Sequence, residues 1–267
     1  MTQQSYEKNK TNLKNRKTKS RNQTLPKTQR INQILSLAGL TSRRKADEWI
    51  KQGRVMLNNH VIREPGIKAV WGQDSIKVDG DEIPQLTDRV YLMINKPFGF
   101  ICTLNDPEGR PGVTDLIKDV TERIYPVGRL DFDSLGLLLL TNDGDWAHRL
   151  SHPRFKVPKT YKITIKGGLS SGDLELLKRG INLEDGFVKP SKVTLLKKGA
   201  DQNLLRITLT SGKSRVIRRI FEHFDHKVIH LIRIGYGNLS LGSLKIGQYR
   251  FLAQDEVDGL KKMVGLK

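Results

Sequence analysis

Apolar residues between positions 30 and 84 recur first at helical spacing and then at strand spacing. Four of them share one helical face and predict a short first helix: Ile31, Ile34, Leu35 and Ala38. A second helix should follow, with Ser42 as its cap and Gly53 as its end. Two apolar runs then break at polar pairs typical of hairpin turns, Asn58–Asn59 and Asp79–Gly80. We therefore expect a compact unit of two helices and a few short strands over residues 30–84.

From residue 88 to residue 262 the pattern changes to strands interleaved with short helices. Four segments are rich in β-branched and large apolar residues and predict strands: Val90–Asn95, Tyr161–Ile165, Leu204–Leu209 and Val228–Ile234. Helices are expected in three places, around Leu174–Arg179, Arg215–Phe224 and Glu256–Met263. Because strands and helices do not alternate regularly, we expect an α+β fold rather than a doubly wound parallel sheet.

Residues 1–29 are rich in lysine and arginine and contain almost no large apolar side chains. Such a segment cannot bury a core, so we expect a disordered basic arm. The simplest interpretation of this arm is an electrostatic tether to nucleic acid. An organelle transit peptide is the alternative, because acidic residues are scarce.

The composition points to a polyanionic partner. The 267 residues include 47 Lys and Arg against 28 Asp and Glu, a formal net charge of +19. Nine basic residues and one acid in residues 1–30 contribute +8, so 19 − 8 = +11 remains on the rest. No stretch approaches the roughly 18 apolar residues of a membrane span, and a secretory core is missing, so we expect a soluble, cytoplasmic protein. The single cysteine, Cys102, excludes an internal disulfide and a cysteine cluster for zinc or iron–sulfur.

The string INQILSLAGLTSRRKADEWIKQGRVMLNNHVI, residues 31–62, resembles the S4-like RNA-binding domain. It has that domain's short helix, its Ser-Arg-Arg at the start of the second helix, and its hairpin with an asparagine turn. The resemblance implies that the helix pair presents a basic face to RNA, with Arg43, Arg44 and Lys51 contacting phosphates rather than bases. A merely solvated helix face is the alternative interpretation of these charges.

The segment from Tyr125 to Trp146 holds the densest concentration of unusual sequence. Four leucines, Leu137–Leu140, predict a strand buried on both faces; the Gly-Arg-Leu-Asp loop leads into it, and a polar turn, Asn142-Asp143-Gly144, should follow it. A carboxylate in this loop would be held rigidly. From the residues alone, Asp131 and Asp133 can be a general acid and base pair, metal ligands, or turn residues that cap their own backbone.

Several motifs for nucleotide or metal binding fail on inspection. Gly212-Lys213-Ser214 ends like a phosphate-binding loop, but Ile207 occupies the position of the first glycine, so no nucleotide cofactor is expected. The run from Asp131 begins like a calcium loop, but Leu135 stands at its fifth position and offers no side-chain oxygen. His223 and His226 lie three residues apart without a third ligand. We therefore predict no metal site.

Four blocks in order resemble the ribosomal-RNA pseudouridine synthases of the RsuA and RluB type. They are NKPFGFICT (Asn95–Thr103), YPVGRLDFDSLGLLLLTNDG (Tyr125–Gly144), KTYKITIKG (Lys159–Gly167) and GKSRVIRRIFEHF (Gly212–Phe224). With the S4-like segment, the resemblance spans residues 30–255. It implies a catalytic domain over residues 88–262 with a mixed, mainly antiparallel sheet and flanking helices, and site-specific isomerisation of uridine to pseudouridine without a cofactor.

The same resemblance assigns roles to three residues. The catalytic aspartate falls on Asp131, the tyrosine that packs on the target base falls on Tyr161, and the basic residue that pairs with the catalytic carboxylate falls on Arg218. The target uridine must be unpaired or turned out of its stack to reach them. Loss of Arg218 should damage catalysis more than folding. A core aromatic is the alternative interpretation of Tyr161.

Three further residues are candidates for contacts with RNA: Arg129, Lys213 and Arg219. Arg129 can instead brace its own loop, and the other two can be simply solvated. The expected partner is ribosomal RNA or a ribosomal subunit precursor, bound by a monomer. Within the family that the chain resembles, the complete N-terminal domain and the form of the Tyr125 block look closest to the enzymes that act on 23S rRNA, which the resemblance therefore implies as substrate. Modification of 16S rRNA, and a non-catalytic protein of rRNA binding or ribosome assembly, are the alternatives.

Overall fold

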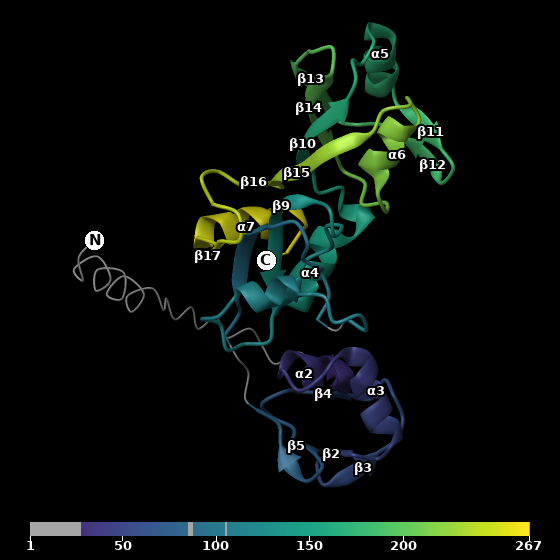
Figure 1. The fold of residues 1–267 in the computed structure, drawn as a ribbon. Coiled ribbons are helices and arrows are strands. Elements are labelled where there is room, and N and C mark those ends of the chain that lie inside the picture. The colour runs from purple at the N-terminus through teal and green to yellow at the C-terminus, as the bar shows by residue number, and fades with distance from the viewer. Residues whose placement is uncertain (1–27, 85–87, 105, 267) are drawn as a thin grey trace, which may run out of the picture. The chain divides into compact units, whose positions relative to one another are not determined.

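The computed structural model describes residues 28–84, 88–104 and 106–266 (Figure 1). The chain divides into two compact units between residues 86 and 87, in the stretch that separates the two predicted domains. Residues 1–27 of the predicted basic arm lie outside the described residues. Gln29, the last residue of that arm, belongs instead to strand β1 (Gln29–Arg30), which pairs with β4 (Lys68–Ala69).

In the N-terminal unit, the two expected helices are present as α2 (Ile31–Leu37) and α3 (Arg43–Lys51). Ser42 caps α3, because its hydroxyl accepts a hydrogen bond from the Lys45 amide at 3.2 Å. The expected hairpins are present as well: β2 (Val55–Leu57) with β3 (His60–Ile62), and β5 (Ile76–Val78) with β6 (Asp81–Glu82). They form one antiparallel sheet in the order β3-β2-β5-β6.

The hairpin turns of this unit have the backbone that their sequences predict. Asn58 and Asn59 have φ of 49° and 67°, and both angles are positive, as the tight turn between two strands requires. The helices and the sheet share one core, in which apolar side chains of the helices pack on those of the strands. Its fully buried members include Ile31, Ile34, Leu35, Ala46 and Val55. The S4-like architecture expected from the sequence is therefore confirmed.

The C-terminal unit is built on a nine-stranded sheet whose main path runs β13-β14-β10-β15-β9-β7-β17. β8 pairs with β9, and β16 pairs with β15. The described pairings are antiparallel except that of β15 with β9, which is parallel. The α+β class with a mixed, mainly antiparallel sheet is thus confirmed. The strands are β7 (Tyr91–Lys96), β8 (Tyr125–Pro126), β9 (Leu135–Thr141), β10 (Lys159–Lys166), β13 (Lys192–Lys197), β14 (Gln202–Leu209), β15 (Val228–Tyr236), β16 (Leu239–Ser240) and β17 (Tyr249–Phe251).

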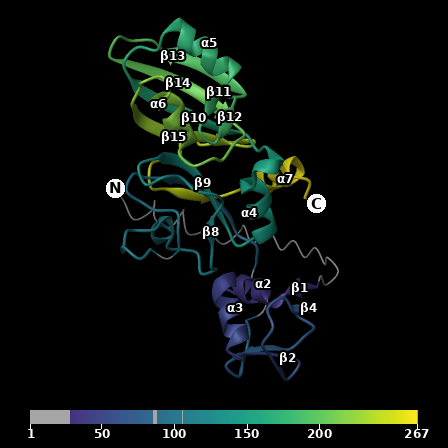
Figure 2. The ribbon, with the colours of Figure 1, turned by 90° about the vertical axis from the view of Figure 1, so that its right-hand side faces the viewer.

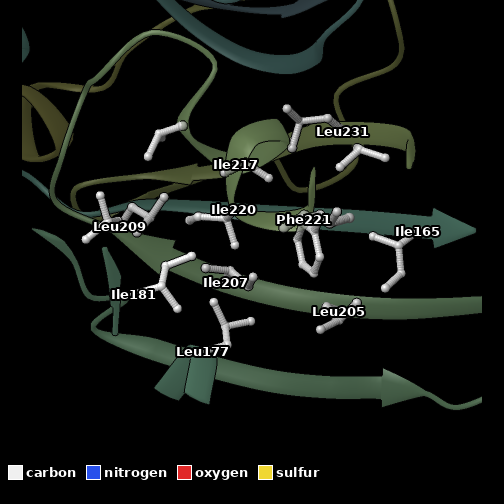
Figure 3. Close-up of a cluster of buried hydrophobic side chains, with 14 of the residues drawn as sticks. Ile165, Leu177, Ile181, Leu205, Ile207, Leu209, Ile217, Ile220, Phe221 and Leu231 are labelled. Atoms are coloured by element: carbon white, nitrogen blue, oxygen red, sulfur yellow. The ribbon is translucent and has the colours of Figure 1, made fainter. Parts of the chain in front are cut away.

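Helices cover the sheet at two places. α5 (Ser171–Arg179) and α6 (Val216–Glu222) pack on β10, β14 and β15, and Figure 3 shows Leu177, Ile220 and Phe221 of this core. α4 (Gly144–Ser151) and α7 (Gln254–Met263) lie on the same side of β9, as Figure 2 shows. The opposite face of β7 and β9 is covered by apolar residues of the segment that joins them, Val113, Ile117, Ile124 and Leu130. This segment ends at the loop that carries Asp131.

Three local features differ from the sequence predictions. Asn142-Asp143-Gly144 was expected to be a polar turn, but α4 begins there, and the Asp143 carboxylate accepts a hydrogen bond from the Trp146 amide at 3.2 Å. Arg215 precedes α6 in a left-handed conformation with φ of 48° and is not its first residue. The pattern also missed β13 and the hairpin of β11 (Ile181–Leu183) with β12 (Gly186–Val188).

In the described part of the chain, no helix combines the length and the apolar character that a membrane crossing needs.

Candidate active site

The central strands of the sheet bring residues that are far apart in the sequence into one row. Tyr161 on β10 is the Cα partner of Arg233 on β15, and Arg233 is the partner of Gly136 on β9. Gly136 is in turn the partner of Lys96, the last residue of β7. The loop with Asp131 leads directly into β9, so it ends next to Gly136 and therefore next to this row.

Close approach of two backbones fixes a glycine at the centre of the row. Gly136 has φ of 104°, a conformation that residues with a side chain rarely adopt. A Cβ atom at this position would lie 2.3 Å from the carbonyl oxygen of Arg233. The parallel pairing of β9 with β15 therefore depends on the missing side chain, and this pairing holds the start of β9 in place.

Lys96 is a buried cation that fixes the backbone of the Asp131 loop. Its ammonium donates to the carbonyl oxygens of Asp131 at 3.0 Å and Ser134 at 2.8 Å, with longer contacts to Pro97 and Phe132. The side chain is fully buried. Burial lowers the pKa of Lys96, because the charged form is costly away from water, while nearby groups that include both loop aspartates oppose that shift. The carbonyl oxygens replace the hydration that the ammonium has lost.

Arg218, on α6, reaches the same loop but pairs with a different aspartate from the one expected. Its Nη2 lies 2.9 Å from Oδ2 of Asp133 and donates to the Asp133 carbonyl oxygen at 3.3 Å. Its Nη1 donates to the carbonyl oxygen of Val228 at 3.2 Å. Arg215 also approaches Asp133, at 3.9 Å. The expected pairing of Arg218 with the Asp131 carboxylate is therefore not present, because the loop turns the Asp133 side chain towards α6.

Among the residues that the structure describes, the Asp131 carboxylate has no partner. It makes no hydrogen bond and no ion pair with any residue that the structure describes, although the Asp131 carbonyl oxygen is held by Lys96 and by the Ser134 amide. The side chain is partly exposed. The backbone on both sides of this carboxylate is thus fixed while its oxygens remain free to meet a substrate.

Tyr161 lies where two hydrophobic cores meet. Its side chain is partly buried and packs both on the core beneath α5 and α6 and on the core that contains Leu130. The second core also contains Leu130, the residue before Asp131. β15 lies between β10, which carries Tyr161, and β9, into which the Asp131 loop leads.

Two further buried cations, Lys159 and Arg233, stand beside this site. The Arg233 Nε donates to the Leu137 carbonyl oxygen at 2.6 Å. Both cations lie over the ring of Tyr236, at 5.0 Å for the Lys159 ammonium and 5.1 Å for the Arg233 guanidinium. Burial, and then the charge of Arg233, lower the pKa of Lys159 to about 8.

The sequence interpretation gave no role to Lys96, Lys159 or Arg233. Lys96 and Lys159 stand inside the two blocks NKPFGFICT and KTYKITIKG, so a signal was present. A lysine in a run of strand residues ordinarily faces water, however, and only the fold shows that these three side chains are buried.

The residues expected to contact RNA around α6 have protein partners. Arg219 forms an ion pair with Asp185 at 2.8 Å, and the Lys213 ammonium lies 3.5 Å from the same carboxylate. Hydrogen bonding from Arg219 holds the pKa of Asp185 down, at about 2. Arg129, by contrast, is exposed and has no ion-pair partner among the described residues.

In the N-terminal unit, the structure places Arg43, Arg44 and Lys51 as expected. All three are exposed on α3, and within the described ranges none of them forms an ion pair. Ala46 and Ile50 occupy the buried side of the same helix. α3 therefore presents uncompensated positive charge to solvent.

No three His, Cys, Asp or Glu side chains gather as a metal site among the residues that the structure describes.

Comparison with known proteins identifies the family. The model of the RNA pseudouridylate synthase family matches residues 90–223, which include β7, the Asp131 loop, Tyr161 and Arg218, and the S4 domain model matches residues 29–69. The chain belongs to the RNA pseudouridylate synthase family. It is thus an RNA pseudouridine synthase with an N-terminal S4 domain, and the activity class and the domain expected from the sequence are confirmed.

Individual pseudouridine synthases resemble this chain over most of its length. An uncharacterized RNA pseudouridine synthase of Aquifex aeolicus is 43% identical over 239 residues, which cover 89% of this chain and 96% of that protein. The ribosomal large subunit pseudouridine synthase B of Bacillus subtilis is 42% identical over 237 residues, covering 88% and 96%. A crystal structure of a pseudouridylate synthase superposes with a TM-score of 0.63 at 29% identity, covering 86% of this chain and 99% of that one.

Proposed function

We propose that this pseudouridine synthase modifies uridine in 23S ribosomal RNA and that Asp131 is its reacting carboxylate. The observation that carries the assignment is that the two aspartates of this loop have different surroundings. The Asp133 carboxylate is occupied by Arg218, whereas the Asp131 carboxylate has no partner among the described residues and stands on a backbone fixed by Lys96. A reacting group needs this combination of a rigid backbone and unoccupied oxygens.

The reaction needs one carboxylate and a binding site for the uracil base. The bond from ribose C1′ to uracil N1 breaks, the base turns, and a bond forms from C1′ to C5. The proton lost from C5 is balanced by one gained at N1, so no oxidant and no outside atom enters. A carboxylate can serve either as nucleophile or as base in such a sequence. Asp131 supplies this group, and the partly buried ring of Tyr161 supplies an aromatic face for the uracil.

Arg218 acts in this proposal as a positioning residue. It ties the Asp133 end of the loop to α6 and to Val228 on β15, so the loop cannot swing when RNA binds. The proposed effect on Asp131 is therefore indirect. A guanidinium suits this task because its planar fork reaches several acceptors at once.

Two features support ribosomal RNA of the large subunit as substrate. The B. subtilis relative, almost all of which aligns with this chain, is named for the large ribosomal subunit. The S4 domain also presents the exposed cations of α3, which suit a phosphate backbone. We propose Arg43, Arg44 and Lys51 as contacts that hold the RNA while the second unit acts on the uridine.

The proposal is tested by mapping pseudouridines in the ribosomal RNA of cells that lack the gene. The same cells are then supplied with wild type, Asp131→Asn or Asp133→Asn, at matched protein levels. Wild type should restore one or a few pseudouridines in 23S rRNA, and Asp131→Asn should restore none. Asp133→Asn should restore them more slowly, because it weakens the link to Arg218 but leaves the Asp131 carboxylate in place.

Other outcomes would correct the proposal at different points. Restoration by Asp131→Asn would remove the catalytic role from that residue. Loss confined to 16S rRNA would move the substrate to the small subunit. If no pseudouridine disappears with the gene, but ribosome assembly fails and Asp131→Asn repairs it, the protein acts by binding alone.

A further inference from the structure

Two exposed phenylalanine rings lie at the loop that carries Asp131, one in the loop itself and one in the neighbouring turn. Phe98, in the turn after β7, is 61% exposed, and Phe132, the next residue after Asp131, is 43% exposed. Their centroids are 5.7 Å apart in an edge-to-face arrangement. Four phenylalanines are exposed within the described ranges, Phe98, Phe132, Phe187 and Phe251, and of these Phe98 and Phe132 lie against each other.

The backbone beneath this aromatic pair is fixed. The Gly99 amide donates to the Phe132 carbonyl oxygen at 3.0 Å, and the Lys96 ammonium lies 3.4 Å from the same oxygen. The two turns are thus joined below the rings, so the rings are not needed to hold the turns together. Their exposure leaves apolar surface in water beside the Asp131 carboxylate.

Charge around the pair favours RNA as its occupant. Arg129 is exposed two residues before Asp131, and the Arg215 side chain is 49% exposed beside Asp133. An apolar protein partner would gain little from these cations. Unstacked bases of RNA, in contrast, bind to aromatic side chains while neighbouring cations hold the phosphates, and this mode tolerates any base because every base has a flat face.

We propose that Phe98 and Phe132 form a stacking platform for an unpaired base that lies next to the target uridine in the substrate RNA. The inference rests on the proposed function, because it takes the Asp131 loop as the place of reaction. When the target uridine turns out of its stack, the neighbouring base loses a stacking partner. The two rings take the place of that partner and so offset part of the lost stacking free energy.

The test measures binding of two oligomers that have the same charge. One is a 12-nucleotide oligouridylate, and the other is the same ribose-phosphate chain without bases. Full-length wild type, the double variant Phe98→Leu/Phe132→Leu, and the matched control Phe251→Leu are compared at one salt concentration by fluorescence anisotropy. Leucine keeps an apolar side chain but removes the aromatic face. Phe251 is 51% exposed and pairs with Leu92, four residues from Lys96 along β7, so it lies roughly 13 Å from the site.

Wild type should bind the base-bearing oligomer more tightly than the abasic one, and the double variant should lose about tenfold of that preference. Binding of the abasic oligomer should stay unchanged, and so should the preference of Phe251→Leu. The platform is refuted if the double variant keeps the full preference, or if it weakens both oligomers equally. Equal loss in Phe251→Leu would refute it as well.

Failure of the platform and failure of the proposed function give different results. If the base preference stays with both rings replaced while Asp131→Asn abolishes modification, only the platform is wrong. If the preference depends on the rings but Asp131→Asn still restores pseudouridine, the platform stands and the catalytic assignment falls. Unfolding midpoints within a degree or two of wild type ensure that either result concerns binding rather than folding.

Discussion

Asp131 and Asp133 are two residues apart, but their side chains meet different surroundings. One carboxylate has an arginine at 2.9 Å, while the other has no partner within the described residues. The guanidinium of Arg218 accounts for the difference, because its two terminal nitrogens reach Asp133 and Val228 together. A single side chain thus holds the loop from one end and leaves the other end available.

Substitution of Arg218 by lysine tests this positioning role. An ammonium keeps the charge but cannot reach Asp133 and Val228 in one plane, so the loop should become looser while the fold survives. We expect Arg218→Lys to lower kcat on an RNA substrate by about tenfold to a hundredfold with little change in KM. Steady-state kinetics on an rRNA transcript measure both. A rise in KM with unchanged kcat would show instead that Arg218 binds RNA.

Lys159 should make stability depend on pH in a recognisable direction. Its pKa is lowered in the folded state to about 8, against 10.5 for a free lysine, so the charged form is penalised by burial. The penalty is fully present below pH 8, fades as pH rises from 8 to 10.5, and is absent above. Between those values the folded protein should gain up to about 3 kcal/mol relative to Lys159→Met. Urea unfolding at pH 7.5, 9 and 10.5 measures the gain.

The exposed Lys162, on the same strand, provides the control for this prediction. Lys162→Met should change the free energy of unfolding by a similar amount at each pH, since that side chain stays in water. If the free energies of unfolding of wild type and Lys159→Met change in parallel across this pH range, the Lys159 ammonium is hydrated in the folded protein.

At the scale of single residues, sequence reasoning located the loop but not its contacts. The Gly-Arg-Leu-Asp block pointed to Asp131 and the Lys-Thr-Tyr block pointed to Tyr161, because both stand in strings with a family resemblance, and their catalytic roles stay predictions. The partner of Arg218 could not be predicted, because residues two positions apart in a turn point in different directions that only the folded loop defines. Burial of Lys96 and Arg233 was hidden for the related reason that it depends on strands far away in the sequence.

At the scale of elements, local signals predicted structure well wherever one motif decides the outcome. The two hairpins follow from Asn58–Asn59 and Asp79–Gly80, and the start of α3 follows from Ser42. The start of α4 shows the limit of such signals. An Asn-Asp-Gly string suits a tight turn, but an aspartate also caps helices, and burial of Trp146 in the core selects the helix here.

The junction of β9 with β15 holds the start of β9, into which the Asp131 loop leads. Gly136→Ala would place a Cβ atom 2.3 Å from the Arg233 carbonyl oxygen, in addition to straining a φ of 104°. We expect a loss of more than about 3 kcal/mol in the free energy of unfolding, because neither backbone can move without breaking the sheet. Chemical denaturation measures it.

Gly186 separates the two causes of that loss. It has a similar φ of 107°, but a Cβ atom there would meet only the end of the Lys213 side chain, at 3.5 Å. Gly186→Ala should therefore cost about 1 kcal/mol, the strain alone. Equal losses in the two variants would show that strain, rather than the contact with β15, requires glycine at position 136.

At the scale of the whole molecule, the excess of positive charge is spread over both units. The chain carries +19, yet several of the cations in the second unit are neutralised locally, as the ion pairs of Asp185 and Asp133 illustrate. On α3, Lys45 is paired with Glu48, but Arg43, Arg44 and Lys51 have no acidic partner among the described residues. Long-range attraction of RNA should therefore depend more on α3 than on α6.

The salt dependence of RNA binding tests this division. Affinity falls as salt concentration rises, and each phosphate contact contributes about 0.7 to 0.9 to the steepness of log affinity against log salt concentration. The triple variant Arg43→Gln/Arg44→Gln/Lys51→Gln should therefore have a slope that is less steep than that of wild type by about 2. The charge-preserving variant Arg43→Lys/Arg44→Lys/Lys51→Arg should keep the slope, since phosphate contacts of this kind need charge rather than fixed geometry. Binding of an rRNA transcript at several salt concentrations measures all three proteins. If the glutamine variant keeps the full slope, α3 does not face the RNA, and if the charge-preserving variant loses it too, these side chains recognise shape or bases instead of phosphates.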